Sequence, residues 1–144
     1  MASPKIVTSS WFTTLPGTHA RIGISRGVPR GTPAGYRRYA ALNPGPWFSS
    51  VPVEEYIARY NDEVLSRLDP QGVLDDLTTL SAGRIPTLLC FEKPVPGPDW
   101  CHRGLVSLWF HQTLGLDVFE FGQERHGFGI SHPKMPPEFR IVLD

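Results

Sequence analysis

The sequence predicts a single α/β domain with a mainly parallel sheet of about four to five strands and helices on both faces, a Rossmann-like arrangement. Three observations support this prediction. Short β-branched or apolar stretches alternate along the chain with longer amphipathic ones. Residues 87–91 are almost continuously apolar, as in a central parallel strand that is covered on both faces. The length of 144 residues suits one domain that buries its own core.

The helices are predicted from apolar spacing and from the residues at their ends. Residues 51–68 carry an apolar stripe at helical spacing, with Pro52 in the first turn and Glu54 near the positive end of the helix dipole. Asp69 caps a second helix, which ends at Gly83. The remaining predicted elements are strands at 5–10, 21–25 and 117–121 and a third helix that opens near Cys101 and closes at Gly115.

Proline and glycine are concentrated in the predicted connections. Residues 27–46 form a long loop in which Arg30 is one of several arginines interleaved with tyrosines. Long loops are often functional, and a cationic, aromatic loop suits a phosphate with a stacked base; it equally suits a solvated surface that balances the acidic helix after it. The whole chain is one domain, with a core at about 5–122 and a C-terminal extension at 123–144 that includes a short strand at 139–143.

Composition restricts the class of protein. The 14 basic and 14 acidic residues give a formal net charge of zero, which argues against a protein that coats nucleic acid, although a local basic patch still allows nucleic-acid contact. Two cysteines are too few for a disulfide scaffold, and the sequence has neither a signal-peptide pattern nor an apolar run of bilayer length. We therefore expect a cytoplasmic protein with reduced thiols and no membrane association.

The two cysteines lie at the two ends of one predicted strand-to-helix connection. Cys90 ends the apolar strand, and Cys101 opens the third helix. Ligand sites in parallel α/β sheets lie beyond the carboxyl ends of the strands, where helix N-termini direct free N–H groups outward. A thiol at such a helix end, with Arg103 beside it, is stabilised as a thiolate. We therefore expect Cys101 to be reactive and Cys90 to pack as a small apolar side chain, with Arg26 on the same sheet edge.

The order of these blocks resembles a known family. Cys-x-Glu at residues 90–92, a loop, and Cys-His-Arg at residues 101–103 resemble the signature of the domain of unknown function 488 family. Blocks similar to a subgroup of that family precede them at 6–10, 24–31 and 42–44. The resemblance covers about residues 5–122, and the blocks in this order are more specific than any one of them. It implies an α/β fold and a site at the two signature blocks, without assigning a reaction.

The candidate mechanism uses Cys101 as a thiolate nucleophile, with Glu92 or His102 moving protons. Cys90 is a further catalytic candidate because it shares the same connection. Three arginines are the candidates for binding substrate: Arg26, Arg103 and Arg30. The sequence has none of the motifs typical of tyrosine phosphatases, P-loop NTPases, serine hydrolases or dinucleotide oxidoreductases.

Two other chemistries use the same residues. In the first, Glu92 is the base at a strand end and the cysteines have no chemical role. In the second, a zinc ion is bound by Cys90, Cys101 and His102, with His111 as the fourth ligand. The spacing argues against zinc, because ten residues separate the cysteines and His111 lies more than two helical turns after His102. We therefore expect no metal and no cofactor.

Together these observations predict an enzyme of unassigned reaction that acts on a small anionic substrate, with a nucleotide or nucleobase component favoured. A binding module that holds a phosphate of a nucleotide or a nucleic acid without turnover is the competing class. A third possibility is a thiol redox-responsive protein in which Cys90 and Cys101 are oxidised together.

Overall fold

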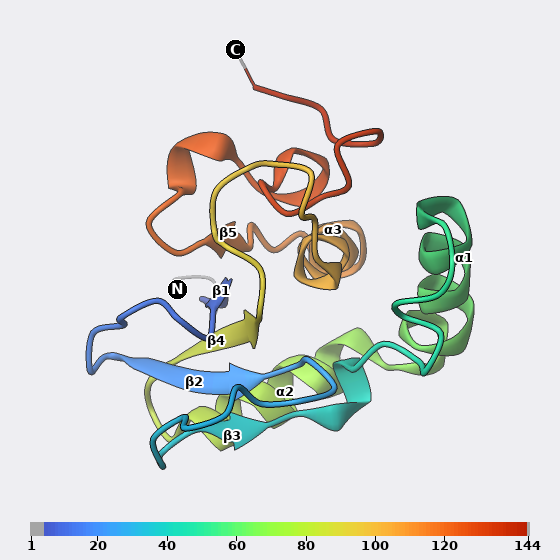
Figure 1. Ribbon diagram of the computed structural model, residues 1–144. Coiled ribbons are helices and arrows are strands. Elements are labelled where there is room, and N and C mark those ends of the chain that lie inside the picture. Colours follow the sequence, from blue (N-terminus) through green and yellow to red (C-terminus); the bar gives the residue numbers. More distant parts are fainter. Residues whose placement is uncertain (1–4, 144) are drawn as a thin grey trace.

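The computed structural model describes residues 5–143, and within them the chain forms a five-stranded, all-parallel sheet (Figure 1). The strands are β1 (Val7–Ser10), β2 (His19–Gly23), β3 (Arg37–Arg38), β4 (Ile85–Cys90) and β5 (Phe119–Glu120). Their order across the sheet is β3-β2-β4-β1-β5, so β4 lies at the centre with β2 and β1 on its two sides. The predicted single α/β domain with a mainly parallel sheet is confirmed.

Three α-helices occur within the described residues: α1 (Val53–Glu63), α2 (Pro70–Ser81) and α3 (His102–Leu114). The first is shorter than its apolar stripe predicts, because the backbone leaves the helix at Val64 and a 3-10 turn, Leu65–Arg67, follows. The ends of α2 follow the sequence signals: Gly72 donates its N–H to the Asp69 carboxylate at 3.0 Å, and the chain turns left-handed at Ala82. Among the described residues, no helix is long and apolar enough to cross a membrane.

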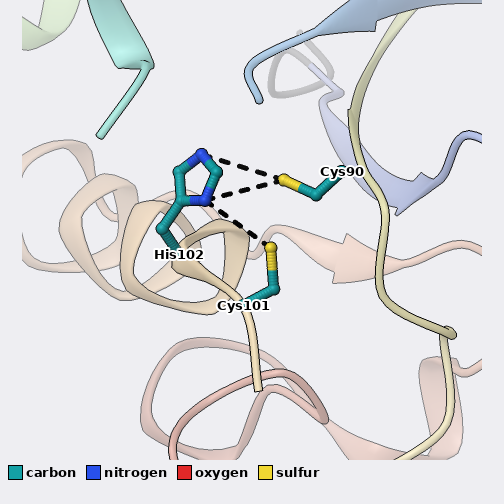
Figure 2. Close-up of side chains that lie close together, drawn as sticks. All are labelled: Cys90, Cys101 and His102. Carbon is teal, nitrogen blue, oxygen red and sulfur yellow. Dashed lines mark hydrogen bonds between the residues drawn. The ribbon is translucent and has the colours of Figure 1, made fainter. Parts of the chain in front are cut away.

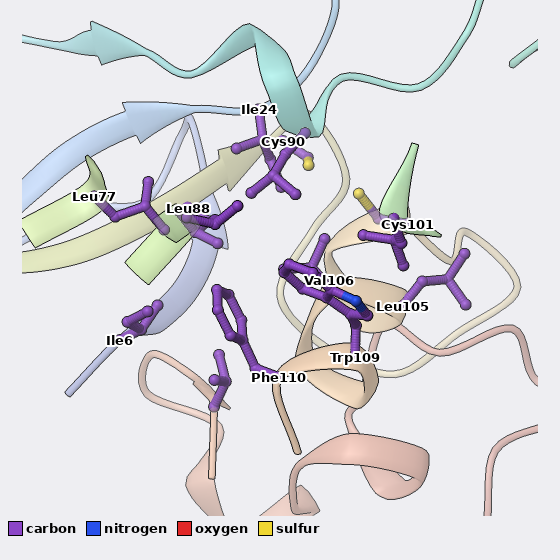
Figure 3. Packing of buried hydrophobic residues seen from close by; sticks show 14 of the residues in the cluster. Ile6, Ile24, Leu77, Leu88, Cys90, Cys101, Leu105, Val106, Trp109 and Phe110 are labelled. Atoms are coloured by element: carbon purple, nitrogen blue, oxygen red, sulfur yellow. The ribbon is translucent and has the colours of Figure 1, made fainter. Parts of the chain in front are cut away.

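Helices α2 and α3 pack on the same face of the sheet, whereas we expected helices on both. Ile24, Leu88 and Cys90 project from neighbouring strands into one cluster, and Leu77 of α2 and Phe110 of α3 pack against them (Figure 3). Right-handed crossovers explain the arrangement. The connections from β3 to β4 and from β4 to β5 advance in the same direction across the sheet, so the helices within them lie on the same side.

The opposite face is covered by loops. The connection from β1 to β2 runs back across the sheet in the other direction and contains turns instead of a helix. Trp11 of this connection packs against Gly23, where an added Cβ would come within 2.2 Å of the indole ring. Its Nε1 donates to Ser25 at 2.9 Å, and the ring of Tyr36 meets it edge-on with centroids 5.4 Å apart. An indole and a tyrosine thus cover the area that a helix would have covered.

The C-terminal extension packs against α3 and is well buried between residues 129 and 135 (Figure 1). At the first turn of α3, a Cβ on Gly104 would meet the backbone of Lys134 at 2.6 Å, so the two segments touch through main-chain atoms. The predicted strand at 139–143 is wrong: these residues form no strand, although Ile141 donates one backbone hydrogen bond to the carbonyl of Ile130.

The long loop after β2 contains the two-residue β3 and a 3-10 turn, Ala40–Leu42.

The contact at Gly104 leads to a stability prediction. Gly104→Ala improves helix propensity but forces the extension away from α3, and we expect it to lower the free energy of unfolding by about 1–3 kcal/mol. Gly17→Ala is the matched control, because no atom lies within 4 Å of the added Cβ there. Urea unfolding of both variants measures the difference, and equal stabilities would contradict a close contact at this position.

Candidate functional site

A pocket of about 470 Å³ opens at the carboxyl ends of β2 and β4, beside the start of α3. Five of the seven residues that the sequence singles out line it: Arg26, Cys90, Glu92, Cys101 and His102. The other two do not. Arg103 is fully buried behind the pocket, and the exposed Arg30 lies beside Trp11 and Phe12, at a separate hollow. Because the carboxyl ends of parallel strands share one edge of the sheet, residues from three separate stretches of sequence meet in this pocket.

At the base of the pocket lie two sulfur atoms and one imidazole, which we call the thiol–imidazole cluster: Cys90, Cys101 and His102 (Figure 2). The Nδ1 atom of His102 is 3.7 Å from the sulfur of Cys90 and 3.6 Å from that of Cys101. Both cysteines are free thiols, and only 1% and 4% of their surfaces are exposed. Cys90 is buried, as expected; Cys101 is buried too, so it is reached only through the pocket.

The tautomer of His102 follows from its partners. Its Nε2 lies 3.0 Å from the carbonyl oxygen of Ile24, which only accepts hydrogen bonds. Nε2 therefore carries the proton, and the unprotonated Nδ1 is the nitrogen next to the sulfur of Cys101. The sulfur of Cys90 lies close to both ring nitrogens, 3.7 Å from Nδ1 and 3.8 Å from Nε2. The edge of the Tyr60 ring, with its centroid 5.5 Å away, packs against the imidazole and helps to fix its orientation.

The two thiols have opposite pKa shifts. Burial alone would raise the pKa of Cys101, but the neighbouring Cys90 and His102 side chains and the positive charge of Arg103 lower it well below the ordinary thiol value. Burial, with the hydrogen bond to Cys101, raises the pKa of Cys90 well above that value. Of the two thiols, Cys101 is therefore the one that ionises more readily.

Glu92 stands at the side of the pocket, two residues beyond the end of β4. Its side chain is 36% exposed. Burial, together with the neighbouring Cys101, raises the pKa of this carboxyl to about 7. Because the acid and the carboxylate then coexist near neutral pH, Glu92 is suited to give or take a proton.

Arg103 is directed away from the pocket, into a buried ion pair with Glu120 of β5. Its Nε lies 3.0 Å from Oε1 of that carboxylate and its Nη2 lies 2.7 Å from Oε2, a two-pronged contact in which neither side chain is exposed. Nη2 also donates to the backbone carbonyls of Glu92 and Lys93, at 2.9 and 3.2 Å. Nη1 has no hydrogen-bond partner among the described residues and lies 3.9 Å from Oε1 of Glu92. Arg103 therefore positions the loop after β4.

Glu120 is also the end of a buried chain of hydrogen bonds that includes Thr8 and His132. Oε1 of Glu120 accepts from the Thr8 hydroxyl at 2.7 Å, and Nε2 of His132 lies 2.7 Å from the same hydroxyl. Nδ1 of His132 accepts from the backbone N–H of Lys134 at 3.0 Å, so Nε2 carries the proton and donates to Thr8. The chain thus runs in one direction, toward the carboxylate. Burial and the nearby Arg103 lower the pKa of His132 well below its ordinary value, which keeps this ring neutral.

Lys134 ties the C-terminal extension to the loop that carries Cys101. Its buried Nζ donates to the carbonyl of Val95 at 3.0 Å and to the Asp99 carboxylate at 3.2 Å. Its own carbonyl accepts from the N–H of Cys101 at 3.0 Å. Sequence reasoning missed Glu120, His132 and Lys134 as positioning residues, because no local pattern marks side chains whose partners are far along the chain.

Four aromatic side chains that the sequence did not single out complete the pocket, and we call them the aromatic wall: Phe48, Tyr56, Phe91 and Trp100. Tyr56 of α1 meets Trp100 edge-on, with ring centroids 4.7 Å apart, and Phe48 and Phe91 line the same space. Burial and the nearby cysteines raise the pKa of Tyr56, so its phenol stays neutral. Arg26 is exposed on the rim, where it donates to the carbonyl of Pro44 at 3.0 Å. Tyr56 lies on the predicted first helix, and only its neighbours in space mark it as part of the site.

No protein-family model, curated protein or solved structure matches this chain. The resemblance to the domain of unknown function 488 family therefore stays a prediction.

The buried ion pair predicts a large effect of one substitution. Glu120→Gln removes the negative partner and leaves the guanidinium of Arg103 buried without a counter-charge, so we expect a loss of about 3–5 kcal/mol in the free energy of unfolding. The matched control is Glu55→Gln, which breaks the exposed pair with Arg59 and should cost less than about 1 kcal/mol. Urea unfolding measures both, and equal losses would show that the buried pair is not structurally required.

The neutral His132 predicts a dependence of stability on pH. Because its pKa is lowered in the folded chain, the unfolded chain takes up the proton first as the pH falls. The stabilisation is present above the unfolded-state pKa of about 6.5 and is lost below it, by up to about 1.4 kcal/mol per pH unit. His132→Asn keeps a side-chain acceptor and cannot titrate. We expect its unfolding free energy, measured in urea, to fall less steeply than that of the wild type below pH 6.5, and parallel curves would contradict the prediction.

Proposed function

We propose that the protein is a thiol enzyme that acts on a small anionic or nucleotide-like substrate, with Cys101 as nucleophile. One observation carries the proposal: the sulfur of Cys101 lies on a pocket, at the N-terminus of α3, 3.6 Å from the Nδ1 atom of His102. A thiol beside an imidazole at a helix N-terminus is the arrangement that activates cysteine for nucleophilic attack.

The neighbouring groups have defined roles in this proposal. His102 holds its Nδ1 against the sulfur because Ile24 fixes Nε2, so the imidazole accepts the thiol proton and stabilises the resulting anion. Glu92 lines the same pocket and is the group that returns a proton to a leaving group. Cys90 lies beside Cys101 at the base of the pocket and helps to lower the pKa of the Cys101 thiol. Attack by Cys101 would form a sulfur–substrate bond, which water then cleaves.

The lining favours a flat substrate with negative charge. Arg26 is the arginine on the pocket wall, and it suits a phosphate or carboxylate. Tyr56 and Trp100 offer ring edges and faces against which a nucleobase would stack. A volume of about 470 Å³ accommodates a small molecule of this size. Arg103 takes no part in binding substrate in this scheme, because its guanidinium is paired with Glu120.

Glu92 carries the second candidate mechanism. Its pKa of about 7 would let it act as a general base without any covalent intermediate, and the two cysteines would then only shape the pocket. The same Cys-x-Glu and Cys-His-Arg blocks carry the resemblance to the domain of unknown function 488 family, so both mechanisms agree with that resemblance.

Thiol alkylation tests the choice between them. In the presence of a metal chelator at pH 7, we expect iodoacetamide to modify Cys101 faster than free cysteine and about tenfold faster than Cys90, with mass spectrometry of peptides to locate the label. Cys101→Ser should abolish the fast phase, and Cys90→Ser should retain a labelled Cys101. A panel of nucleotides and nucleobases should slow the labelling. If Cys101 reacts no faster than free cysteine and no nucleotide protects it, the nucleophile proposal fails and Glu92 or simple binding takes its place.

A further inference from the structure

The thiol–imidazole cluster has the dimensions of a metal site. The ligand atoms of Cys90, Cys101 and His102 all lie within 4.8 Å of one another. Zinc binds thiolate sulfur at about 2.3 Å and imidazole nitrogen at about 2.0–2.1 Å, and at a tetrahedral angle these bonds separate sulfur from nitrogen by about 3.6 Å. The observed separations from Nδ1 are 3.7 and 3.6 Å. The separations of both sulfurs from Nδ1 therefore match the sulfur–nitrogen distance at a tetrahedral zinc ion.

The imidazole is also oriented as a metal ligand requires. Ligating histidines usually donate their other ring N–H to a carbonyl or a carboxylate, which fixes the tautomer and the plane of the ring. The carbonyl of Ile24 accepts from Nε2 of His102 at 3.0 Å and leaves Nδ1 without a proton, 3.6 Å from the sulfur of Cys101. The sulfur of Cys90 lies almost equally far from Nδ1 and Nε2, at 3.7 and 3.8 Å, so a bound ion would require a small rotation of the imidazole or of the Cys90 side chain. The hydrogen bond to Ile24 is a second observation, independent of the distances within the cluster.

We propose that Cys90, Cys101 and His102 bind a zinc ion whose fourth coordination position opens to the pocket. All three side chains line that pocket, and so does Glu92, which is placed to accept a hydrogen bond from a water or substrate atom on the metal. Three protein ligands with one open position are typical of catalytic zinc, whereas structural zinc has four protein ligands. His111 is not the fourth ligand: its side chain is 46% exposed and pairs with Asp117 at 3.6 Å.

The metal and the nucleophile of the proposed function compete for the same sulfur atom. Zinc forms two Zn–S bonds and one Zn–N bond, and the cluster releases about two protons, whether these start on both sulfurs or on Cys90 and the imidazole. Each sulfur then shares a lone pair with zinc, which makes it less reactive toward carbon. The inference uses the same three side chains as the proposed function, but it does not depend on that activity.

Cobalt(II) serves as the spectroscopic probe, because tetrahedral thiolate coordination gives it visible absorption and a thiolate-to-metal charge-transfer band. We expect one equivalent of Co²⁺ to produce both features in the wild-type protein and one equivalent of Zn²⁺ to abolish them. In weak buffer, Zn²⁺ should also release about two protons per protein. Absence of the charge-transfer band, or a spectrum typical of octahedral cobalt, would overturn the proposal.

Two variants test the ligands and a third is the control, and thermal unfolding shows that each is folded. Cys101→Ser and His102→Ala should each weaken the apparent Kd for Zn²⁺ by on the order of 100-fold or more, since loss of even an outer-shell partner costs 10–100-fold. His111→Ala is the matched control and should bind as the wild type does. If His102→Ala does not fold, Cys101→Ser alone decides, and a charge-transfer band of undiminished strength in that variant would overturn the site.

The metal site and the proposed function fail separately. If Cys101 is alkylated fast in chelator but cobalt gives no charge-transfer band, the nucleophile proposal is supported and the metal site is contradicted. If cobalt gives the band but Cys101 is alkylated slowly in chelator, the metal site is supported and the nucleophile proposal is contradicted. If both proposals hold, one equivalent of Zn²⁺ should slow alkylation of Cys101 at least about tenfold, and chelator should restore the rate.

Discussion

The ion pair between Arg103 and Glu120 is the constraint on which the site depends. Two charges with no exposed surface cost several kcal/mol to remove from water, and a good geometry with further hydrogen bonds is needed to offset that cost. Here the carboxylate has two contacts with the guanidinium and a third with Thr8, and the guanidinium also binds two backbone carbonyls of the loop after β4. The first turn of α3, the edge strand β5 and the start of the loop after β4 are thereby held in one arrangement.

Such a pair specifies position more than it adds stability, because apolar replacements of buried ion pairs are often neutral or stabilising. What it fixes is the distance between the end of β4 and the start of α3, which is the distance between Cys90 and the other two members of the thiol–imidazole cluster. Lys134 holds the same loop from its far end, through Val95 and Asp99. With both ends held by buried cations, the loop keeps Cys101 directed at the base of the pocket.

The sequence predicted the meeting of Cys90, Glu92 and Cys101, because the ends of parallel strands and the N-termini of the following helices always share one edge of the sheet. Predictions from this rule were wrong for residues whose contacts lie far away along the chain. Arg103 was expected to face the substrate, but Glu120, seventeen residues away on β5, directs it inward. Ten residues between two cysteines argued against a shared ligand set, yet the loop folds back and brings both sulfurs to one imidazole. Helices were expected on both faces, but the short β1–β2 connection covers one face with Trp11 instead.

Access and reactivity are decided by different parts of the molecule. The cluster determines what chemistry the sulfur of Cys101 performs, as a thiolate beside an imidazole or as a ligand to a metal ion. Because only 4% of that residue is exposed, whatever reacts with it must first pass Glu92 and the aromatic wall. Tyr56 and Trp100 therefore act as a size and shape filter in front of a cluster that by itself would react with many electrophiles or soft metals. Under the proposed function, α1 and the loop after β4 would therefore determine selectivity, and the junction of β4 with α3 would determine reactivity.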